Sequence, residues 1–176
     1  MNTALLVIDV QVGLAAGAHD AEHLLANIAD LIARARRASA PVIYLQHESV
    51  TWPPLKRGAP TWQIHPRVAP APGDTVLGKT ASDSFYQTAL HEELQRRGVR
   101  RVVVTGMQSE YCVDTTCRSA LSRDFDVTLA SDAHTTGGPA AARTIAHHNT
   151  VLSNLAHPSR RIVVSASAAI DFDAAQ

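Results

Sequence analysis

The amino-acid sequence predicts a three-layer α/β fold, in which a six-stranded, mainly parallel sheet is doubly wound with helices on both faces. Two observations predict this fold. Six short runs rich in Val, Ile and Leu alternate with longer segments of helical periodicity, which is the order typical of βαβ units. Most of these runs are almost continuously apolar, as expected for parallel strands that are buried on both faces.

The predicted strands are, in chain order, Ala4–Val10, Pro41–Gln46, Thr75–Gly78, Arg101–Thr105, Val127–Ala130 and Arg161–Ser165. The third run is the least apolar of the six. The predicted crossover helices are Asp20–Ala38, Asp83–Arg97, Tyr111–Arg123 and Pro139–Leu155. In the first of them Leu and Ile repeat at helical spacing, and Gly98 follows the second, where it suits the position after a helix C-terminus.

The segment His47–Gly73 interrupts this alternation. It holds six of the nine prolines and both tryptophans, and it has no clear period. A connection this long is usually functional, disordered or in contact with a partner, so both a lid and a subunit-contact arm are open interpretations. We find no internal repeat or second domain, and we expect residues 1–176 to form one domain.

Composition excludes several classes of protein. Sixteen basic side chains balance sixteen acidic ones, whereas a nucleic-acid-binding protein typically has a basic excess. No apolar stretch approaches the ~20 residues of a membrane helix, and no basic region precedes the N-terminal apolar run, so neither a membrane span nor a signal peptide is expected. Cys112 and Cys117 are poorly spaced for a disulfide, which favours a cytoplasmic protein with reduced thiols.

Three reactive side chains follow the predicted strands. Asp9 ends the first strand, Lys79 follows the third, and Cys112 lies at the start of the helix after the fourth. Because ligands of open parallel sheets bind beyond the carboxyl ends of the strands, we expect the three to meet at one edge. Each residue type also has an ordinary structural role: a cysteine in the core, an aspartate in a turn and a lysine in solvent.

Together, these residue types suit nucleophilic catalysis. A helix N-terminus and a nearby lysine both favour the thiolate of Cys112, the nucleophilic form. The carboxylate of Asp9 could take the thiol proton and later pass it to a leaving amine. Backbone amides around residues 108–112 could stabilise an oxyanion.

Several sequence blocks carry a resemblance to a known family. They are the opening strand with Asp9 and Gln11, the pair Gly78-Lys79 followed by DSF at 83–85, VTGMQSEYCVDTT at 104–116, and DVTLASDA at 126–133. In these blocks the chain resembles the isochorismatase-like cysteine hydrolases, which include nicotinamidases and N-carbamoylsarcosine amidases. The resemblance covers nearly the whole chain and implies the isochorismatase-like form of the α/β fold.

The resemblance also implies roles for individual residues. Asp9, Lys79 and Cys112 would form the catalytic triad, and the family's non-proline cis peptide would map to Met107-Gln108. The backbone amides of Gln108 and Cys112 would then form the oxyanion hole. Ser109 stands where many relatives have Thr. The partners implied are a small-molecule substrate and further copies of this chain, in a homodimer or a higher homo-oligomer.

Two departures narrow the expected chemistry. Nicotinamidases carry an Asp-x-His segment that binds a metal after the second strand, where this chain has Gln46-His47-Glu48-Ser49, with His65 far along the loop. We therefore expect no metal and no cofactor, although His47 and His65 remain candidate ligands. True isochorismatases lack the nucleophilic cysteine and cleave a vinyl ether, so Cys112 favours acyl transfer.

The resulting hypothesis is cysteine-dependent hydrolysis of an amide, imide or carbamoyl C–N bond through a thioester acyl-enzyme. The alternatives are a non-catalytic homologue whose thiol senses oxidants and a vinyl-ether hydrolase. A nucleotide-binding module is disfavoured because Gly13 and Gly17 do not form a dinucleotide-binding loop. His19 and His23 have a spacing that can share a metal, but two polar residues in an exposed first helical turn are the favoured interpretation.

Candidate pocket residues are aromatic or polar side chains near these segments. They are Gln11, His47, Trp52, Trp62, Phe85 and Tyr111. Phe85 could equally pack in the core, and the two tryptophans could equally contact another subunit.

Overall fold

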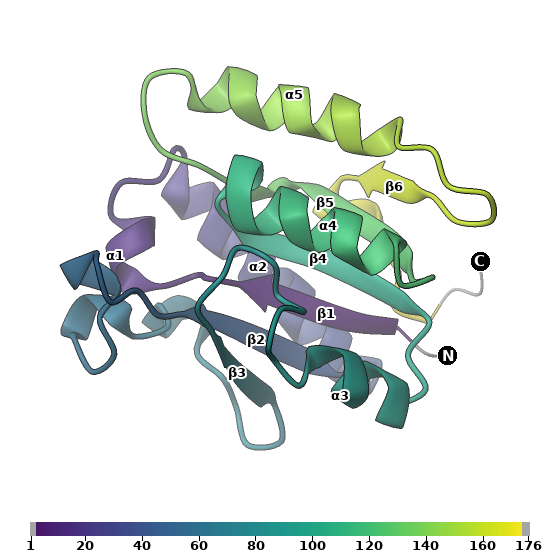
Figure 1. Cartoon of the computed structure of the whole chain (residues 1–176), viewed down its shortest axis with the longest axis horizontal. Helices are drawn as coiled ribbons and strands as arrows, with labels where there is room; N and C mark the ends of the chain where they lie inside the picture. The colour runs from purple at the N-terminus through teal and green to yellow at the C-terminus, as the bar shows by residue number, and fades with distance from the viewer. Residues whose placement is uncertain (1–2, 174–176) are drawn as a thin grey trace.

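A six-stranded sheet runs through the computed structural model, which describes residues 3–173 (Figure 1). Its strands are β1 (Thr3–Ile8), β2 (Val42–His47), β3 (Thr75–Lys79), β4 (Arg101–Met107), β5 (Asp126–Thr135) and β6 (Ile162–Ser165). The strand order is β3-β2-β1-β4-β5-β6, and all neighbouring pairs are parallel. The predicted fold is confirmed. The expected domain includes residues 1–2 and 174–176, which lie outside the described residues.

Helices cover both faces of the sheet (Figure 1). They are α1 (Val12–Ala15), α2 (Ala21–Arg37), α3 (Leu90–Arg96), α4 (Asp114–Leu121) and α5 (Ala141–Ser153). The apolar side of α2 packs on one face with the C-terminal residues Ile170 and Phe172, whereas α3, α4 and α5 pack on the other. None of the helices within residues 3–173 combines the length and the apolar character needed to span a membrane.

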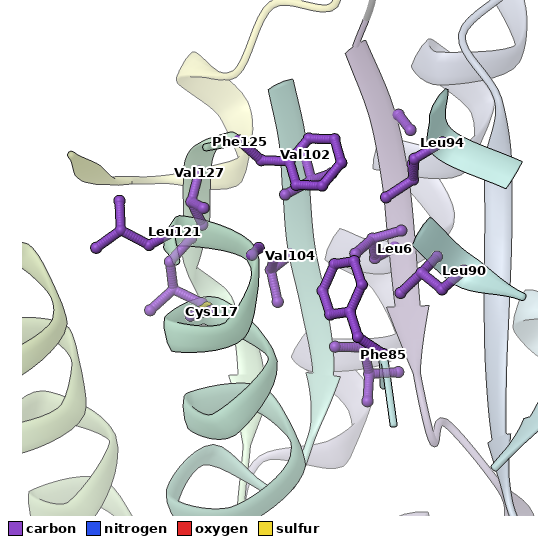
Figure 2. Close-up of a cluster of buried hydrophobic side chains, with 14 of the residues drawn as sticks. Leu6, Phe85, Leu90, Leu94, Val102, Val104, Cys117, Leu121, Phe125 and Val127 are labelled. Carbon is purple, nitrogen blue, oxygen red and sulfur yellow. The ribbon is translucent and has the colours of Figure 1, made fainter. Parts of the chain in front are cut away.

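The core on the side of α3, α4 and α5 follows directly from the apolar strands (Figure 2). Leu6 of β1 and Val104 of β4 point into it and are fully buried. Cys117 of α4 is also fully buried there and behaves as a small apolar residue. Burial of each large apolar side chain contributes about 1.5–3 kcal/mol, so this layer fixes the helices that carry the site.

Two predicted helices differ from those observed. The second begins at Leu90 instead of Asp83, because side chains in 83–89 bond to the local backbone: the Asp83 carboxylate accepts from the Phe85 amide at 2.8 Å, and the Thr88 hydroxyl donates to the Ser84 carbonyl at 2.6 Å. Such bonds compete with a helix. The third begins with a wide π-helical turn, η4 (Ser109–Val113), which precedes α4.

The crossovers change direction between β1 and β4, which places a crevice at their carboxyl ends. Gly106 makes the two strands fit closely there. Its φ is +116°, and a Cβ atom on this residue would collide with the carbonyl oxygen of Ile8. Ile8 is the last residue of β1 and pairs with Gly106. Asp9, the next residue, therefore lies close to the segment that follows Gly106.

The segment between β2 and β3 is ordered by three short 3₁₀ turns, η1 (Pro53–Leu55), η2 (Pro60–Trp62) and η3 (Pro66–Val68). Each turn begins with proline, whose fixed φ suits the first position of a helical turn. Leu55 and Val68 are buried, and Ile64 forms a bridge with Gln11, so the segment packs against the body of the protein. Its role as lid or as subunit-contact arm stays a prediction.

Candidate active site

Asp9, Lys79 and Cys112 come from three separate elements and lie together at the carboxyl edge of the sheet. Asp9 follows β1 with a φ of +52°, Lys79 is the last residue of β3, and Cys112 lies in η4. Aspartate is one of the few side chains that tolerate this left-handed backbone. The expected meeting of the three residues is therefore a feature of the structure.

The Lys79 ammonium is the centre of the cluster. Its Nζ lies 2.8 Å from Asp9 Oδ2, 2.9 Å from the Ala81 carbonyl oxygen, 3.2 Å from Cys112 Sγ and 3.3 Å from His47 Nδ1. The side chains of Lys79 and Asp9 are 0% and 1% exposed. Apart from this ion pair, neither carboxylate oxygen of Asp9 has a hydrogen-bond partner among residues 3–173.

The charges set the protonation of this cluster. Burial by itself would lower the pKa of Lys79, but the Asp9 carboxylate and Cys112 raise it above its ordinary value, so the amine is charged at neutral pH. Burial, followed by the positive charge of Lys79, lowers the pKa of His47, which is therefore neutral at that pH. The ammonium is thus the fixed positive charge beside Cys112.

Cys112 does not favour the thiolate, and the expectation that it would is wrong. Burial, and after it the Asp9 carboxylate, raises the pKa of the thiol to about 12, while Lys79 opposes this rise without cancelling it. The expectation from sequence considered the helix N-terminus and Lys79, which lower the thiol pKa, but not desolvation or the carboxylate, which raise it. At neutral pH Cys112 is a thiol beside an acceptor for its proton.

The turn before Cys112 has the backbone that the resemblance implied. The peptide Met107–Gln108 is cis, which confirms that expectation. The backbone amide of Gln108 donates to no acceptor among the described residues, and Gln108 lines the same cavity as Cys112. This amide is therefore available to a bound group, and its part in an oxyanion hole, together with the amide of Cys112, stays a prediction.

A cavity of about 200 Å³ opens in front of the thiol. It is lined by Asp9, Leu14, His47, Trp52, Leu55, Ser82, Met107, Gln108, Tyr111 and Cys112. A cavity of about 150 Å³ can hold benzene, so this one accommodates a compact acyl group. The arrangement brings a thiol, a carboxylate and a fixed ammonium to the wall of a small pocket.

Comparison with known proteins identifies the family. A model of the isochorismatase domain matches residues 3–167 of the chain. The chain belongs to the isochorismatase family. A crystal structure of an isochorismatase from Pseudomonas putida KT2440 has a TM-score of 0.86 and 27% identity to it, over 96% of this chain and 90% of that one. The family fold therefore extends over nearly all of the chain.

The curated relatives that match the chain are named for different compounds. Streptothricin hydrolase from Streptomyces noursei is 40% identical over 136 residues, which cover 76% of this chain and 54% of that protein. A second streptothricin hydrolase from the same organism is 39% identical, over 76% of this chain and 49% of that protein. The chain therefore spans about half the length of both relatives. Ureidoacrylate amidohydrolase from Variovorax paradoxus is 29% identical, over 79% of this chain and 71% of that protein.

The predicted pocket residues divide into two groups in this isochorismatase-family chain. His47, Trp52 and Tyr111 line the cavity. The expectation that Phe85 lines it is wrong, because Phe85 is buried in the core, where its ring stacks on Phe125 at a centroid distance of 6.1 Å (Figure 2). Packing between two apolar layers determined its position.

Gln11 and Trp62 were also expected at the pocket wall, but they are not among the residues that line this cavity. Gln11 is fully buried behind the wall, where its side-chain amide donates to the His47 carbonyl and accepts from the His47 backbone amide, both at 3.0 Å. It also donates to the Trp62 carbonyl at 2.7 Å. Gln11 therefore fixes the backbone of His47 beside the second turn of the long segment.

Four lining residues were not predicted at the pocket from the sequence: Leu14, Leu55, Ser82 and Met107, the last of which was expected only as part of the cis peptide. Leu14 lies in the short helix α1, and Leu55 lies in the proline-rich segment, where the absence of a period hid its orientation. Ser82 follows Lys79 closely in sequence, and this spacing from a candidate catalytic residue was the one signal that could have indicated it.

The residues at the site do not fit a bound metal ion. Within residues 3–173, one group of His, Cys, Asp and Glu side chains brings three potential ligand atoms within 4.8 Å of one another: Asp9, His47 and Cys112. Contacts of the Lys79 ammonium to all three already place a positive charge among them, which would repel a metal ion. His65 is not a member of this group; its ring accepts from the Arg67 amide.

We expect exhaustive chelation to leave turnover of any substrate unchanged, since the lysine occupies the position that a metal would need. The measurement compares initial rates before and after dialysis against a strong chelator. Loss of activity that zinc or iron restores would show that His47 or His65 binds a metal in the working enzyme.

We expect alkylation of Cys112 by iodoacetamide to be slow at neutral pH and to keep rising well above pH 9, because burial and Asp9 raise the thiol pKa to about 12. The Lys79→Met variant should be slower still, because the lysine charge lowers this pKa. Rates are measured in a Cys117→Ala background, and unfolding is measured in parallel, since an unpaired buried carboxylate can cost about 3–5 kcal/mol. A rate that levels off near neutral pH would contradict the raised pKa.

Proposed function

We propose that this chain is a cysteine-dependent hydrolase that cleaves an amide, imide or carbamoyl C–N bond of a small molecule through a thioester acyl-enzyme. One observation carries the proposal: the Lys79 ammonium joins the Asp9 carboxylate and the Cys112 thiol, at 2.8 and 3.2 Å, on the wall of a cavity of about 200 Å³. Nucleophile, proton acceptor and fixed charge meet where a compact substrate can bind.

Acylation begins with a thiol, because the pKa of Cys112 is raised to about 12. As Sγ attacks the carbonyl carbon, the thiol proton moves to Asp9, so the thiolate need not accumulate. The C–N bond then breaks, and Asp9 returns this proton to the leaving nitrogen. The products of this half are ammonia or an amine and an acyl group bound to Sγ as a thioester.

Deacylation uses the same groups, but water is now the nucleophile and the Cys112 sulfur is the leaving group. A water molecule attacks the thioester carbonyl and transfers a proton to Asp9, which has become a carboxylate again. The C–S bond breaks, and Sγ recovers a proton from Asp9 as the acid leaves. Thiol, carboxylate and ammonium are thereby restored.

The remaining groups orient the reacting side chains and stabilise the negative charge that develops on the substrate oxygen. The backbone amides of Gln108 and Cys112 would donate to the oxyanion of each tetrahedral intermediate, where removal of one donor typically costs about 10²–10³ in kcat. Lys79 holds Asp9 and Cys112 in a fixed geometry and supplies positive charge during proton transfer. Gln11 holds His47 against Lys79 from behind.

The two alternative functions fit the site less well. Oxidant-sensing cysteines have a low pKa and are accessible, whereas burial and Asp9 raise the pKa of Cys112. A vinyl-ether hydrolase requires no nucleophilic thiol, and a covalent acyl adduct would exclude it for this chain.

The names of the relatives support the hydrolysis of non-peptide C–N bonds, since they include an amidohydrolase and a streptothricin hydrolase. They do not assign a substrate. We therefore propose a compact small molecule as the substrate, with no nucleic acid or membrane as partner, and a homo-oligomer as the assembly.

The test is a panel of primary amides, cyclic imides, ureides and carbamoyl compounds, scored by ammonia release or by loss of the substrate for imides. The proposal expects turnover of at least one class and an acyl adduct on the peptide that contains Cys112 after acid quenching. Turnover of a vinyl ether without an adduct, or reversible oxidation of Cys112 with no hydrolysis, would support one of the alternatives instead.

A further inference from the structure

Ser109 lies inside the turn that the proposed reaction uses. It follows Gln108 directly and precedes Cys112 by three residues. Its side chain is 0% exposed, so it cannot contact solvent, and it does not line the cavity. Its hydroxyl instead lies 2.8 Å from Nδ1 of His134 on β5. This buried polar contact has no part in the chemical steps described above.

The contact continues as a chain of side-chain hydrogen bonds across three elements. His134 is 2% exposed, and its Nε2 lies 2.9 Å from Asn149 Oδ1 on α5. The Asn149 amide nitrogen donates to the Ser131 carbonyl at 3.3 Å, so its oxygen faces the imidazole. His134 Nε2 must then carry the proton and donate, and Nδ1 is left to accept a hydrogen bond from the Ser109 hydroxyl.

An irregularity in the sheet brings His134 to this position. Val104 pairs with Leu129, but Gly106, two residues later, pairs with His134, five residues later on β5. The extra residues bulge out of the ladder and place His134 opposite Gly106, beside the turn that carries Gln108 and Cys112. Bulges next to active sites commonly re-aim a side chain. The chain of hydrogen bonds thus depends on the local shape of β5.

The turn η4 is held from behind by two side-chain hydrogen bonds, from Ser109 to His134 and from the Thr136 hydroxyl to the Glu110 carboxylate, at 2.8 Å each. Its wide π-helical geometry leaves the Tyr111 and Val113 amides to share the Gln108 carbonyl, at 3.1 and 3.2 Å. On the side away from the cavity, the Ser109 hydroxyl connects it through His134 to the rigid sheet and to α5. A shift of this turn would move the Cys112 sulfur and the Gln108 amide together.

We propose that Ser109, His134 and Asn149 are positioning residues, which hold the turn so that the Cys112 thiol and the Gln108 amide face the substrate together. The inference rests on the proposed cysteine mechanism for its effect on turnover. None of the three residues touches the reacting atoms. Their role is to fix the geometry of residues that do, and misplacement by about 1 Å can cost about 10²-fold in rate.

The test compares Ser109→Ala with Ser109→Thr, which keeps the hydroxyl. For a substrate identified by the amide panel, Ser109→Ala should lower kcat by about tenfold to a hundredfold while KM changes little, and Ser109→Thr should restore most of kcat. The alkylation rate of Cys112 should change in the opposite direction. Burial is the main cause of the raised thiol pKa, so a loosened turn that admits water should lower this pKa. The thiol of Ser109→Ala should then react several-fold faster with iodoacetamide.

Thr116→Val is the matched control. Thr116 lies four residues beyond Cys112, and its hydroxyl bonds to the Ser84 hydroxyl at 2.8 Å, with both residues 0% exposed. The same Thr116 oxygen accepts from the Ser84 backbone amide at 3.2 Å. Thr116→Val therefore removes two equally buried hydrogen bonds near the site without touching the turn, and kcat and the alkylation rate should stay as in the wild type. If Ser109→Ala behaves like Thr116→Val in both measurements, Ser109 only packs, and the inference is overturned.

Asn149→Leu keeps the inference testable if Ser109→Ala does not fold, because Asn149 lies on the outer helix α5 and leucine is a good helix former. Asn149→Leu should lower kcat and raise the alkylation rate, as Ser109→Ala does, but by a smaller amount. Unchanged values of both would overturn the proposal that the three residues position the turn. If no amide is hydrolysed at all, the proposed function fails, but the alkylation rates still decide whether the three residues position Cys112.

Discussion

Cys112→Ala is expected to abolish turnover of every amide that proves to be a substrate of the wild-type protein, and Cys117→Ala to retain most of the activity. This result is expected because the two cysteines have different surroundings. Cys112 lines the cavity 3.2 Å from Lys79 Nζ, and without its sulfur no thioester can form. Cys117 is fully buried among the apolar side chains of α4 and the sheet, away from the cavity (Figure 2).

The comparison requires folded variants. Cys112→Ala removes one partly buried sulfur and should keep the circular dichroism spectrum and a cooperative unfolding transition. Cys117→Ala leaves a small void in the core, so its free energy of unfolding should fall modestly while its kcat does not. Equal activity of wild type and Cys112→Ala would remove the cysteine mechanism altogether, since water would then be the nucleophile.

Asp9→Asn is expected to lower kcat by about 10²–10⁴, the usual range for loss of a general acid–base group. Asparagine has nearly the shape of aspartate but cannot take the thiol proton or return it to the leaving nitrogen. Because the thiol pKa is raised to about 12, attack at neutral pH depends on this transfer. The measurement is the single-turnover rate of acylation, together with the steady-state kcat.

The covalent intermediate provides a second measurement for the same variant. Hydroxylamine added during turnover should divert the thioester to a hydroxamate in the wild type, and the yield per unit time should fall in Asp9→Asn. The variant also leaves Lys79 buried without its counter-ion, so its stability must be measured in the same buffer. Hydrolysis at the wild-type rate in Asp9→Asn would assign the proton transfer to another group, such as His47, whose ring nitrogen lies within 4.8 Å of the Cys112 sulfur.

The strands could be predicted because their composition leaves little choice. A run such as Val102–Thr105 is apolar on both sides, and only a sheet covered on both faces buries all of it. Helix boundaries were less predictable, because they depend on individual bonds. The bond from the Phe85 amide to the Asp83 carboxylate belongs to a turn before α3, and the sequence offered no sign that it would prevail over helical periodicity.

The candidate site shows the same division. The carboxyl ends of parallel strands meet at one edge, so the ends of β1 and β3 and the turn after β4 could be placed together from sequence. The order of the strands inside the sheet, which brings Lys79 to Asp9 across β2, was not visible there. Nor was the protonation of Cys112, since the pKa of a thiol depends on how much water reaches it and on the distance to each charge.

The sequence by itself determined the alternation of strands and helices, the identity of the three reactive residues and the edge at which they lie, because these depend on hydrophobic pattern and on strand direction. Only the tertiary structure decided that Phe85 packs in the core, that Gln11 supports His47 from behind and that a bulge in β5 carries His134 to Ser109. Those outcomes depend on side-chain packing and hydrogen bonds between segments distant in sequence, which no local pattern encodes.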